Sequence, residues 1–301
     1  MSTTYRILAA TDFSADATNA VERAAMLAAE HGAQLRLLHV VSEPSVVQLR
    51  AGLRSGTDVE RLLVAEARRS MEKLAGEIQA RHSVIAIQQV EVGSIVDTVL
   101  LVMKQSDLLV VGPRGLHPTQ SLFMGSMAER LLRRAVCPML VVRSPPRTRY
   151  ARILIPVDFS SHSLAAIAFA QSLAPGATRQ VLHSFECPFE GQLRMAGVQQ
   201  NIIDEYRQDA AVKTRTSMDE LLASIPEKAL RSTIDYGDPR AVIVATVERQ
   251  AVDLIVIGKR GRSMLEEHFI GGTTRAVLAG ASCDVAVVPE NSPLRGKSSS
   301  S

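Results

Sequence analysis

Two loops rich in glycine are the part of the sequence best suited to chemistry. The first runs Gly112-Pro-Arg-Gly115, nine further residues, then Gly125-Ser126; the second runs Gly258-Lys-Arg-Gly261, nine further residues, then Gly271-Gly272-Thr273-Thr274. Glycine lets the backbone approach a ligand closely, so that amide N–H groups converge on an anion. Each loop also leads into an expected helix, whose free N–H groups and dipole favour phosphate. The sequence therefore predicts a phosphate-binding loop in each half of the chain.

Hydroxyl and basic side chains strengthen this prediction. Ser126 and Thr273-Thr274 offer hydroxyl donors where the helices begin, and Arg114 and Lys259-Arg260 place positive charge inside the loops. The competing interpretation is that the glycines only make tight turns after strands, and it stays open. The motifs G-x-x-x-x-G-K-[ST] and G-x-G-x-x-G do not occur in the sequence, so neither a P-loop NTPase nor a Rossmann dehydrogenase is expected.

The two loops belong to a duplicated sequence. Arg6–Ser14 reads RILAATDFS and Arg152–Ser160 reads RILIPVDFS, while Asp107–Gly112 (DLLVVG) returns as Asp253–Gly258 (DLIVIG). A repeat this long indicates two domains rather than a solenoid array. We expect domains at 1–144 and 150–290, an extended and solvated joint at 143–150, and a disordered tail at 291–301.

Apolar segments place both loops in an α/β fold. Strands are expected at 6–10, 35–41, 84–92, 108–111 and 139–142, and in the second copy at 153–157, 180–184, 233–236, 254–257 and 285–288. Helices are expected between them, except for a loop through Pro44, Gly52 and Gly56. This alternation predicts a doubly wound, five-stranded parallel sheet in each copy. With strand order 3-2-1-4-5, ligands would bind where the order reverses, beside Asp12 or Asp158.

Composition excludes several other classes of protein. The 301 residues are 46% hydrophobic and 22% charged, with a net charge of +3 and no long block of like charge, so no nucleic-acid partner is expected. No apolar run approaches the ~18 residues of a membrane span, so no membrane partner is expected either. Three cysteines without C-x-x-C spacing favour neither disulfides nor a metal site, which fits a cytoplasmic protein. His39 and His183 are interpreted as packed side chains rather than metal ligands.

The combined motifs resemble the universal stress protein family. ATP-binding members carry G-x2-G-x9-G-[ST] after the fourth strand, begin with a strand ending in P-x-D-F-S, and finish in C-P-V-L-V-V. Here Asp12-Phe13-Ser14, the loop GPRGLHPTQSLFMGS and CPMLVV stand at the matching places, and the second copy offers Pro156–Ser160 and its own loop. The resemblance covers almost the whole chain as a tandem pair with an adenine nucleotide α-hydrolase-like fold.

The resemblance implies an ATP site in each copy, with Mg²⁺. Asp12 would face the ribose or the metal, and the backbone at Val40 would read adenine. The resemblance further implies that ribose and phosphates are held in the first copy by Gly112, Gly115, Gly125 and Ser126. The corresponding site residues of the second copy are Asp158, Ser184, Gly258, Gly261, Gly271 and Thr274. The family pattern is incomplete, because Ala10 replaces a proline, Ala128 replaces a second hydroxyl, and Gly272 replaces the serine. The first copy is expected to bind ATP slightly better than the second.

Three functions follow from this interpretation. The first is a stress-response protein whose bound ATP controls contacts with an unknown protein partner. The second is an ATP-independent scaffold, and the third is a slow ATPase, for which Asp12 and Asp158 are the only evident candidates; binding is favoured and no residue is assigned as catalytic. Family members often dimerise through the fifth strand, so the two copies are expected to form an internal pseudo-dimer, with a homodimer of two chains as a further possibility.

Overall fold

The computed structural model describes residues 4–52, 58–115, 125–226, 230–261 and 269–290. The first repeat contains β1 (Arg6–Ala10), α1 (Ala15–His31), β2 (Gln34–Ser42), α2 (Glu43–Gly52), α3 (Val59–His82), β3 (Ala86–Gly93), α4 (Ile95–Met103), β4 (Leu108–Val111), α5 (Ser126–Arg134) and β5 (Met139–Val141). The second contains β6 (Arg152–Pro156), α6 (Ser161–Leu173), β7 (Thr178–Phe185), α7 (Glu190–Met195), α8 (Gln200–Ala223), β8 (Arg231–Tyr236), α9 (Pro239–Gln250), β9 (Leu254–Gly258), α10 (Gly272–Gly280) and β10 (Asp284–Val288).

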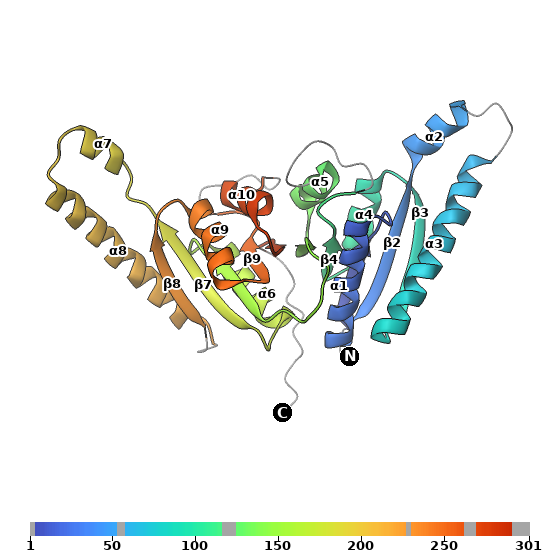
Figure 1. The fold of residues 1–301 in the computed structure, drawn as a ribbon, viewed down its shortest axis with the longest axis horizontal. Coiled ribbons are helices and arrows are strands. Elements are labelled where there is room, and N and C mark those ends of the chain that lie inside the picture. The colour runs from blue at the N-terminus through green and yellow to red at the C-terminus, as the bar shows by residue number, and fades with distance from the viewer. Residues whose placement is uncertain (1–3, 53–57, 116–124, 227–229, 262–268, 291–301) are drawn as a thin grey trace.

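The strands form one sheet in the order β3-β2-β1-β4-β5-β10-β9-β6-β7-β8. Each repeat alone is parallel with order 3-2-1-4-5, as the sequence predicts. The repeats join where β5 pairs antiparallel with β10, with Leu140 opposite Ala286. The fifth strands of the two repeats therefore pair within one chain, and Figure 1 shows α5 and α10 beside this junction.

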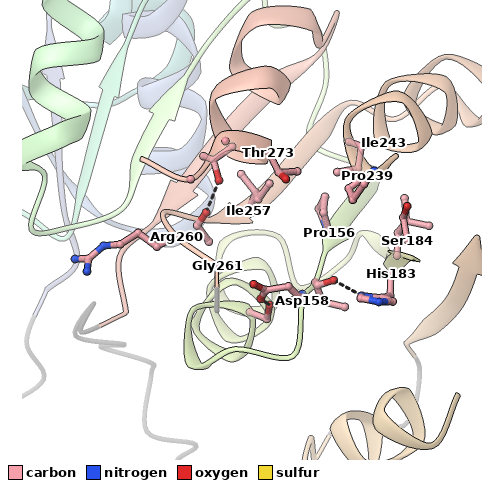
Figure 2. Close-up of a pocket in the computed structure, with 17 residues that line it drawn as sticks. Pro156, Asp158, His183, Ser184, Pro239, Ile243, Ile257, Arg260, Gly261 and Thr273 are labelled. Atoms are coloured by element: carbon pink, nitrogen blue, oxygen red, sulfur yellow. Dashed lines mark hydrogen bonds between the residues drawn. The ribbon is translucent and has the colours of Figure 1, made fainter. Parts of the chain in front are cut away.

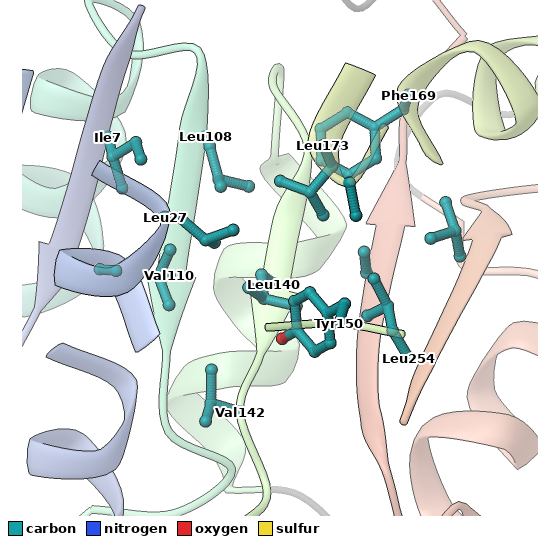
Figure 3. Close-up of a cluster of buried hydrophobic side chains, with 14 of the residues drawn as sticks. Ile7, Leu27, Leu108, Val110, Leu140, Val142, Tyr150, Phe169, Leu173 and Leu254 are labelled. Carbon is teal, nitrogen blue, oxygen red and sulfur yellow. The ribbon is translucent and has the colours of Figure 1, made fainter. Parts of the chain in front are cut away.

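Strands β4 and β5 are buried on both faces, which agrees with their wholly apolar sequences. Leu108 and Val110 of β4 pack into one hydrophobic cluster, whereas Leu109 and Val111 pack into the other. Both clusters contain residues of both repeats, and Figure 3 shows Leu140 and Leu254 in the same cluster. Successive side chains of a strand point to opposite faces of the sheet, so each face has a hydrophobic core that runs across the junction.

The joint between the repeats is less solvated than expected. Tyr150 is buried, its hydroxyl donates to Asp284 Oδ2 at 2.6 Å, and the Arg23 guanidinium lies 4.0 Å from the centre of its ring. Arg23 also donates to the Thr148 carbonyl, and the Arg143 amide donates to Asp284 Oδ1. Burial raises the pKa of Asp284, and these donors oppose the shift. The ends of the joint therefore pack over the β5–β10 pairing, whereas residues 144, 145 and 147–149 between them are exposed, as predicted for a solvated linker.

The predicted ends of α1 are confirmed, whereas one predicted loop is a helix. Ser14 caps α1 and Gly32 ends it in the left-handed conformation, as the sequence indicates. Residues 43–52 were expected to be a loop but form α2. Pro44 lies in the first turn and Gly52 is the last residue, where both are compatible with a helix, and the buried side chain of Val46 packs with Val41 and Ala67. The domain limits stay a prediction, and the tail at 291–301 lies outside the described residues.

Candidate functional site

A cavity of about 290 Å³ lies at the carboxyl ends of β6, β7 and β9 in the second repeat. Figure 2 shows side chains from these strands, α9 and the start of α10 around it. Its lining residues are Pro156, Val157, Asp158, Ser163, Leu182, His183, Ser184, Pro239, Ile243, Ile257, Gly258, Arg260, Gly261, Gly271, Gly272, Thr273 and Thr274. The structure therefore brings together all eight residues of the second repeat that the sequence predicts as site residues.

The carboxylate of Asp158 is held by a set of serine donors. Its Oδ1 accepts hydrogen bonds from the Ser160 amide, the Ser160 hydroxyl and the Ser163 hydroxyl, at 3.1, 2.6 and 2.8 Å. Ser163 Oγ also accepts from the Asp158 amide at 3.0 Å. Sequence reasoning missed Ser163, and its place in the first turn of α6 was the available signal. The carboxylate is fixed in orientation before any ligand arrives.

Two glycines of the second loop, Gly258 and Gly261, leave no room for a side chain. A Cβ on Gly258 would lie 2.8 Å from His162 Cβ, and a Cβ on Gly261 would lie 2.6 Å from Asp158 Oδ2. The Gly271 amide donates to the Lys259 carbonyl at 3.0 Å, which closes the loop against the start of α10. The loop thus brings its backbone against Asp158, and residues 262–268 lie outside the described part of the chain.

The hydroxyl residues at the start of α10 play different parts. Thr274 is buried, and its hydroxyl donates to the Gly258 carbonyl at 2.9 Å. Its proton is thus used inside the loop in this conformation, and its donation to phosphate stays a prediction. Thr273 is only half-buried, and the exposed Gly272 begins the helix. The first amides of α10 have no acceptor within the helix, so they remain the natural donors for an anion.

The opposite side of the cavity is lined by apolar side chains, with a hydrogen bond from Ser184 to the backbone at its edge. Leu182, Ile243 and Ile257 line it, and Ser184 donates its hydroxyl to the Gly237 carbonyl at 2.6 Å. His183 stacks on Phe159 with ring centres 4.3 Å apart, and its Nδ1 lies 2.7 Å from the Val157 carbonyl oxygen. The interpretation of His183 as a packed side chain is confirmed.

The first repeat repeats this plan in its described residues. Asp12 Oδ1 accepts from the Ser14 amide at 3.0 Å, and a Cβ on Gly115 would lie 2.5 Å from Asp12 Oδ2. The Gly125 amide donates to the Pro113 carbonyl at 2.8 Å. Ser126 is exposed at the first position of α5. Asp12 and the glycines therefore come together, while residues 116–124 of the loop are not described.

The other predicted residues of the first repeat are placed as follows. Val40 is buried near the end of β2, and the side chain of Arg114 is exposed. A Cβ on Gly112 would lie 2.7 Å from the Asp16 backbone, so this glycine is required by packing. His39 stacks on Phe13 at 4.5 Å and lies 2.9 Å from the Thr11 carbonyl oxygen, which confirms a packed role.

The basic residues of the second loop do not point into the cavity. Lys259 is buried, and its Nζ donates to the Arg133 and Ala135 carbonyls of the first repeat at 2.8 and 3.3 Å. In Figure 2 the guanidinium of Arg260 extends away from the other lining residues. The prediction that Lys259 contacts phosphate is wrong in this conformation, because the neighbouring repeat supplies its acceptors.

The described residues hold neither a metal-ligating cluster nor a membrane-spanning helix. Within the described ranges, no three His, Cys, Asp or Glu side chains gather as a metal site. Over the same ranges, no helix combines the length and apolar character needed to cross a membrane. Cys137 and Cys283 are buried free thiols, and burial raises the pKa of each to about 12. Both cysteines are therefore packed apolar residues, as expected.

Fold and site together define a tandem pair of doubly wound α/β domains with a cavity at the strand-order reversal. The model of the universal stress protein family matches residues 4–143 and again 149–289. The chain therefore belongs to the universal stress protein family, whose members act in the stress response.

Individual relatives agree with this assignment. A universal stress protein of Mycolicibacterium smegmatis is 25% identical over 95% of this chain and 97% of its own length. Universal stress protein A homolog 2 of Coxiella burnetii is 32% identical over 41% of this chain and 83% of its own length. The crystal structure of a universal stress protein from Archaeoglobus fulgidus superimposes with a TM-score of 0.69 at 18% identity, covering 95% of this chain and 98% of that one, which supports the fold.

Proposed function

We propose that this universal stress protein binds ATP in the second-repeat cavity and that the bound nucleotide controls its contacts with a protein partner in the cytoplasm. The observation that carries the proposal is the convergence of Asp158, the glycine loop and the start of α10 on one cavity. Ligands of open α/β sheets bind at this place, beyond the carboxyl ends of the strands where their order reverses.

The lining of the cavity fits the parts of an adenine nucleotide. Leu182, Ile243 and Ile257 offer apolar walls for the base. The Asp158 carboxylate, held by its serine donors, offers acceptors for ribose hydroxyls. The amides of Gly272 and Thr273 at the start of α10 suit phosphate oxygens. Asp158 is the only carboxylate among the described lining residues, so Mg²⁺ would be held mainly by the phosphates and would neutralise their charge.

Binding is favoured over hydrolysis by the same lining. A hydrolase needs a group that orients the attacking water as well as groups that hold the phosphates. Asp158 Oδ1 already accepts three hydrogen bonds, and its Oδ2 faces Gly261. No second carboxylate lines the described cavity to position a water molecule. A similar ATP site in the first repeat, with Asp12 and Gly115, is part of the proposal.

The first test is recovery and titration of the nucleotide. The full chain is purified without added nucleotide and denatured, and the released small molecules are identified by mass spectrometry. The protein is then titrated with Mg-ATP by calorimetry. Gly261→Val displaces the Asp158 carboxylate and should abolish binding at the second site, whereas Gly176→Val, in open space, should leave it intact.

Each outcome selects one function. Released ATP, or binding heat that falls in Gly261→Val but not in Gly176→Val, supports the proposal. No released nucleotide and no heat at millimolar Mg-ATP favours an ATP-independent scaffold, in which the glycines serve packing alone. Phosphate release that disappears in the Asp12→Asn, Asp158→Asn double variant favours a slow ATPase.

A further inference from the structure

Lys259 holds the end of a helix that belongs to the other repeat. It lies between the two glycines of the second loop and is 4% exposed. Its Nζ donates to the carbonyls of Arg133 and Ala135, at the penultimate residue and the C-cap of α5. The last carbonyls of a helix accept no hydrogen bond from an N–H group of the same helix. The helix dipole also favours a cation at this end. The ammonium group therefore satisfies the C-terminal end of α5 from across the junction.

The other end of α5 begins at the first glycine loop. The Gly125 amide, just before the helix, donates to the Pro113 carbonyl at 2.8 Å, and Pro113 lies between Gly112 and Gly115. A nine-residue helix is a rigid rod about 13 Å long. One rigid element thus contacts the first loop at its N-terminus and the second loop at its C-terminus.

The reverse connection is built differently. Pro113 occupies the position in the first loop that Lys259 occupies in the second, and proline has no donor to reach α10. Instead the guanidinium of Arg143, which follows β5, donates to the Leu278 carbonyl near the end of α10. Among the described residues of the two loops, Lys259 is therefore the side chain that holds the opposite helix.

We propose that Lys259 couples the two glycine loops, so that ATP bound in the second-repeat cavity tightens ATP binding at the first loop. This inference rests on the proposed function. Gly258 and Gly261 line the cavity, and a ligand that orders them also orders the lysine between them. Its buried bonds pass this order to α5, so the first site has less freedom left to lose when it binds. By linkage, ATP at the first site tightens the second by the same factor.

Calorimetry of the full chain with Mg-ATP measures the coupling. In the wild type we expect the second binding step to be about fivefold tighter than independent sites allow, which lies within the usual range of coupling. Lys259→Met should make the two sites independent, and Lys259→Arg, which keeps a cationic donor, should restore the coupling. The matched control is Lys213→Met, which removes an exposed lysine on α8. Coupling that is equal in the wild type and Lys259→Met overturns the proposal.

Hydrogen exchange tests the same link without changing Lys259. In Gly115→Val the first site is disabled, because the new side chain would displace the Asp12 carboxylate. Saturating Mg-ATP should then slow amide exchange severalfold in the last turn of α5, and adding Lys259→Met should abolish this protection. Exchange of α5 that ATP leaves unchanged in Gly115→Val overturns the coupling alone, whereas a wild type that takes up no ATP overturns the proposed function together with it.

Discussion

The two glycine loops share their glycines and differ in the polar groups around them. Gly112 and Gly258 both pack against the first turn of a helix, and Gly115 and Gly261 both face an aspartate. Around those glycines, Pro113 stands where the second loop has Lys259, and Ala17 stands where the second repeat has Ser163.

This difference teaches how much a glycine spacing can report. The shared glycines have a sufficient cause in packing, since a Cβ at any of these four positions would meet other atoms at 2.8 Å or less. A repeated spacing is therefore evidence for a repeated fold. The differing side chains carry the information about ligand binding and about communication between the repeats, because they decide which donors are free and which are used inside the protein.

The largest effect is expected where packing is shared. In Gly112→Ala the new Cβ would lie 2.7 Å from the Asp16 carbonyl carbon and 2.8 Å from its oxygen, both in the backbone of α1. Overpacking against backbone should lower the free energy of unfolding by about 3 kcal/mol. Gly258→Ala meets His162 Cβ at 2.8 Å and the His162 backbone oxygen only at 3.1 Å, so its loss should be smaller, about 2 kcal/mol.

Urea unfolding followed by circular dichroism measures both losses. Gly76→Ala is the matched control, because Gly76 lies inside α3 with open space around it, and alanine there should stabilise the helix by up to about 1 kcal/mol. Equal stability of Gly112→Ala and Gly76→Ala would show that packing does not require this glycine.

The next effect separates the two aspartates. Ser163 is 3% exposed and bonds both the amide and the carboxylate of Asp158, whereas the corresponding Ala17 is 4% exposed and cannot bond Asp12. Ser163→Ala leaves the part-buried Asp158 amide without that partner and should cost about 1 kcal/mol. Ala17→Ser should change stability by less than about 0.5 kcal/mol, because its hydroxyl gains Asp12 as an acceptor. Thermal unfolding compares the two, and equal losses would contradict the asymmetry.

A smaller effect depends on pH and concerns the histidine beside Asp12. The pKa of His39 is lowered, chiefly because burial penalises the imidazolium, while the Thr11 carbonyl and the Asp12 carboxylate oppose the shift. The unfolded chain therefore binds a proton at a higher pH than the folded chain. The free energy of unfolding should fall as the pH drops below about 6.5, by at most about 1.4 kcal/mol per pH unit.

His39→Gln should remove this part of the pH dependence. Unfolding is compared for the variant and the wild type at pH 8, where the imidazole is neutral in both states, and at several values between pH 7 and 5. The difference between the two proteins should shrink as the pH falls. A difference that stays constant from pH 8 to pH 5 would mean that the titration of His39 is not linked to folding.

The sequence predicts the parts of this molecule that depend on neighbours along the chain. Runs such as Leu108–Val111 predict buried strands because a strand between two helical layers needs apolar residues on both faces. The cap at Ser14 also follows from local spacing, whereas the approach of Gly115 to Asp12 follows from the predicted strand order. Helix α2 was missed because Pro44 and Gly52 suggest a loop. The packing of Val46 against Ala67, which accompanies the helix, cannot be seen in the sequence.

The resemblance predicts that the fifth strands pair, but the side-chain contacts between the repeats could not be predicted from the sequence. Lys259 meets Ala135, and Tyr150 meets Asp284, only because β5 and β10 pair antiparallel in one register. The direction of a hydroxyl is equally hidden, since Thr274 at a helix start is as compatible with phosphate as with the Gly258 carbonyl that it contacts. Residue types therefore predict where a site lies, and packing decides which of its donors remain available.

The smallest effect concerns the two serines that follow the paired aspartates by two residues. Ser14 Oγ accepts from the Ala17 amide at 3.2 Å and caps α1, whereas Ser160 makes no such cap on α6 and donates its hydroxyl to Asp158 at 2.6 Å. Ser14→Ala should lower the free energy of unfolding by about 1 kcal/mol, and Ser14→Asp should restore it because aspartate also caps helices.

Ser160→Ala should act on the ligand rather than on the helix. The Asp158 carboxylate loses one of the donors that fix it, so Mg-ATP affinity at the second site should fall severalfold, measured by calorimetry in the Gly115→Val background. Ser160→Asp should not restore binding, since a second carboxylate repels Asp158. If Ser160→Asp rescued both stability and affinity, Ser160 would be a capping residue like Ser14, and the two repeats would use this serine in the same way.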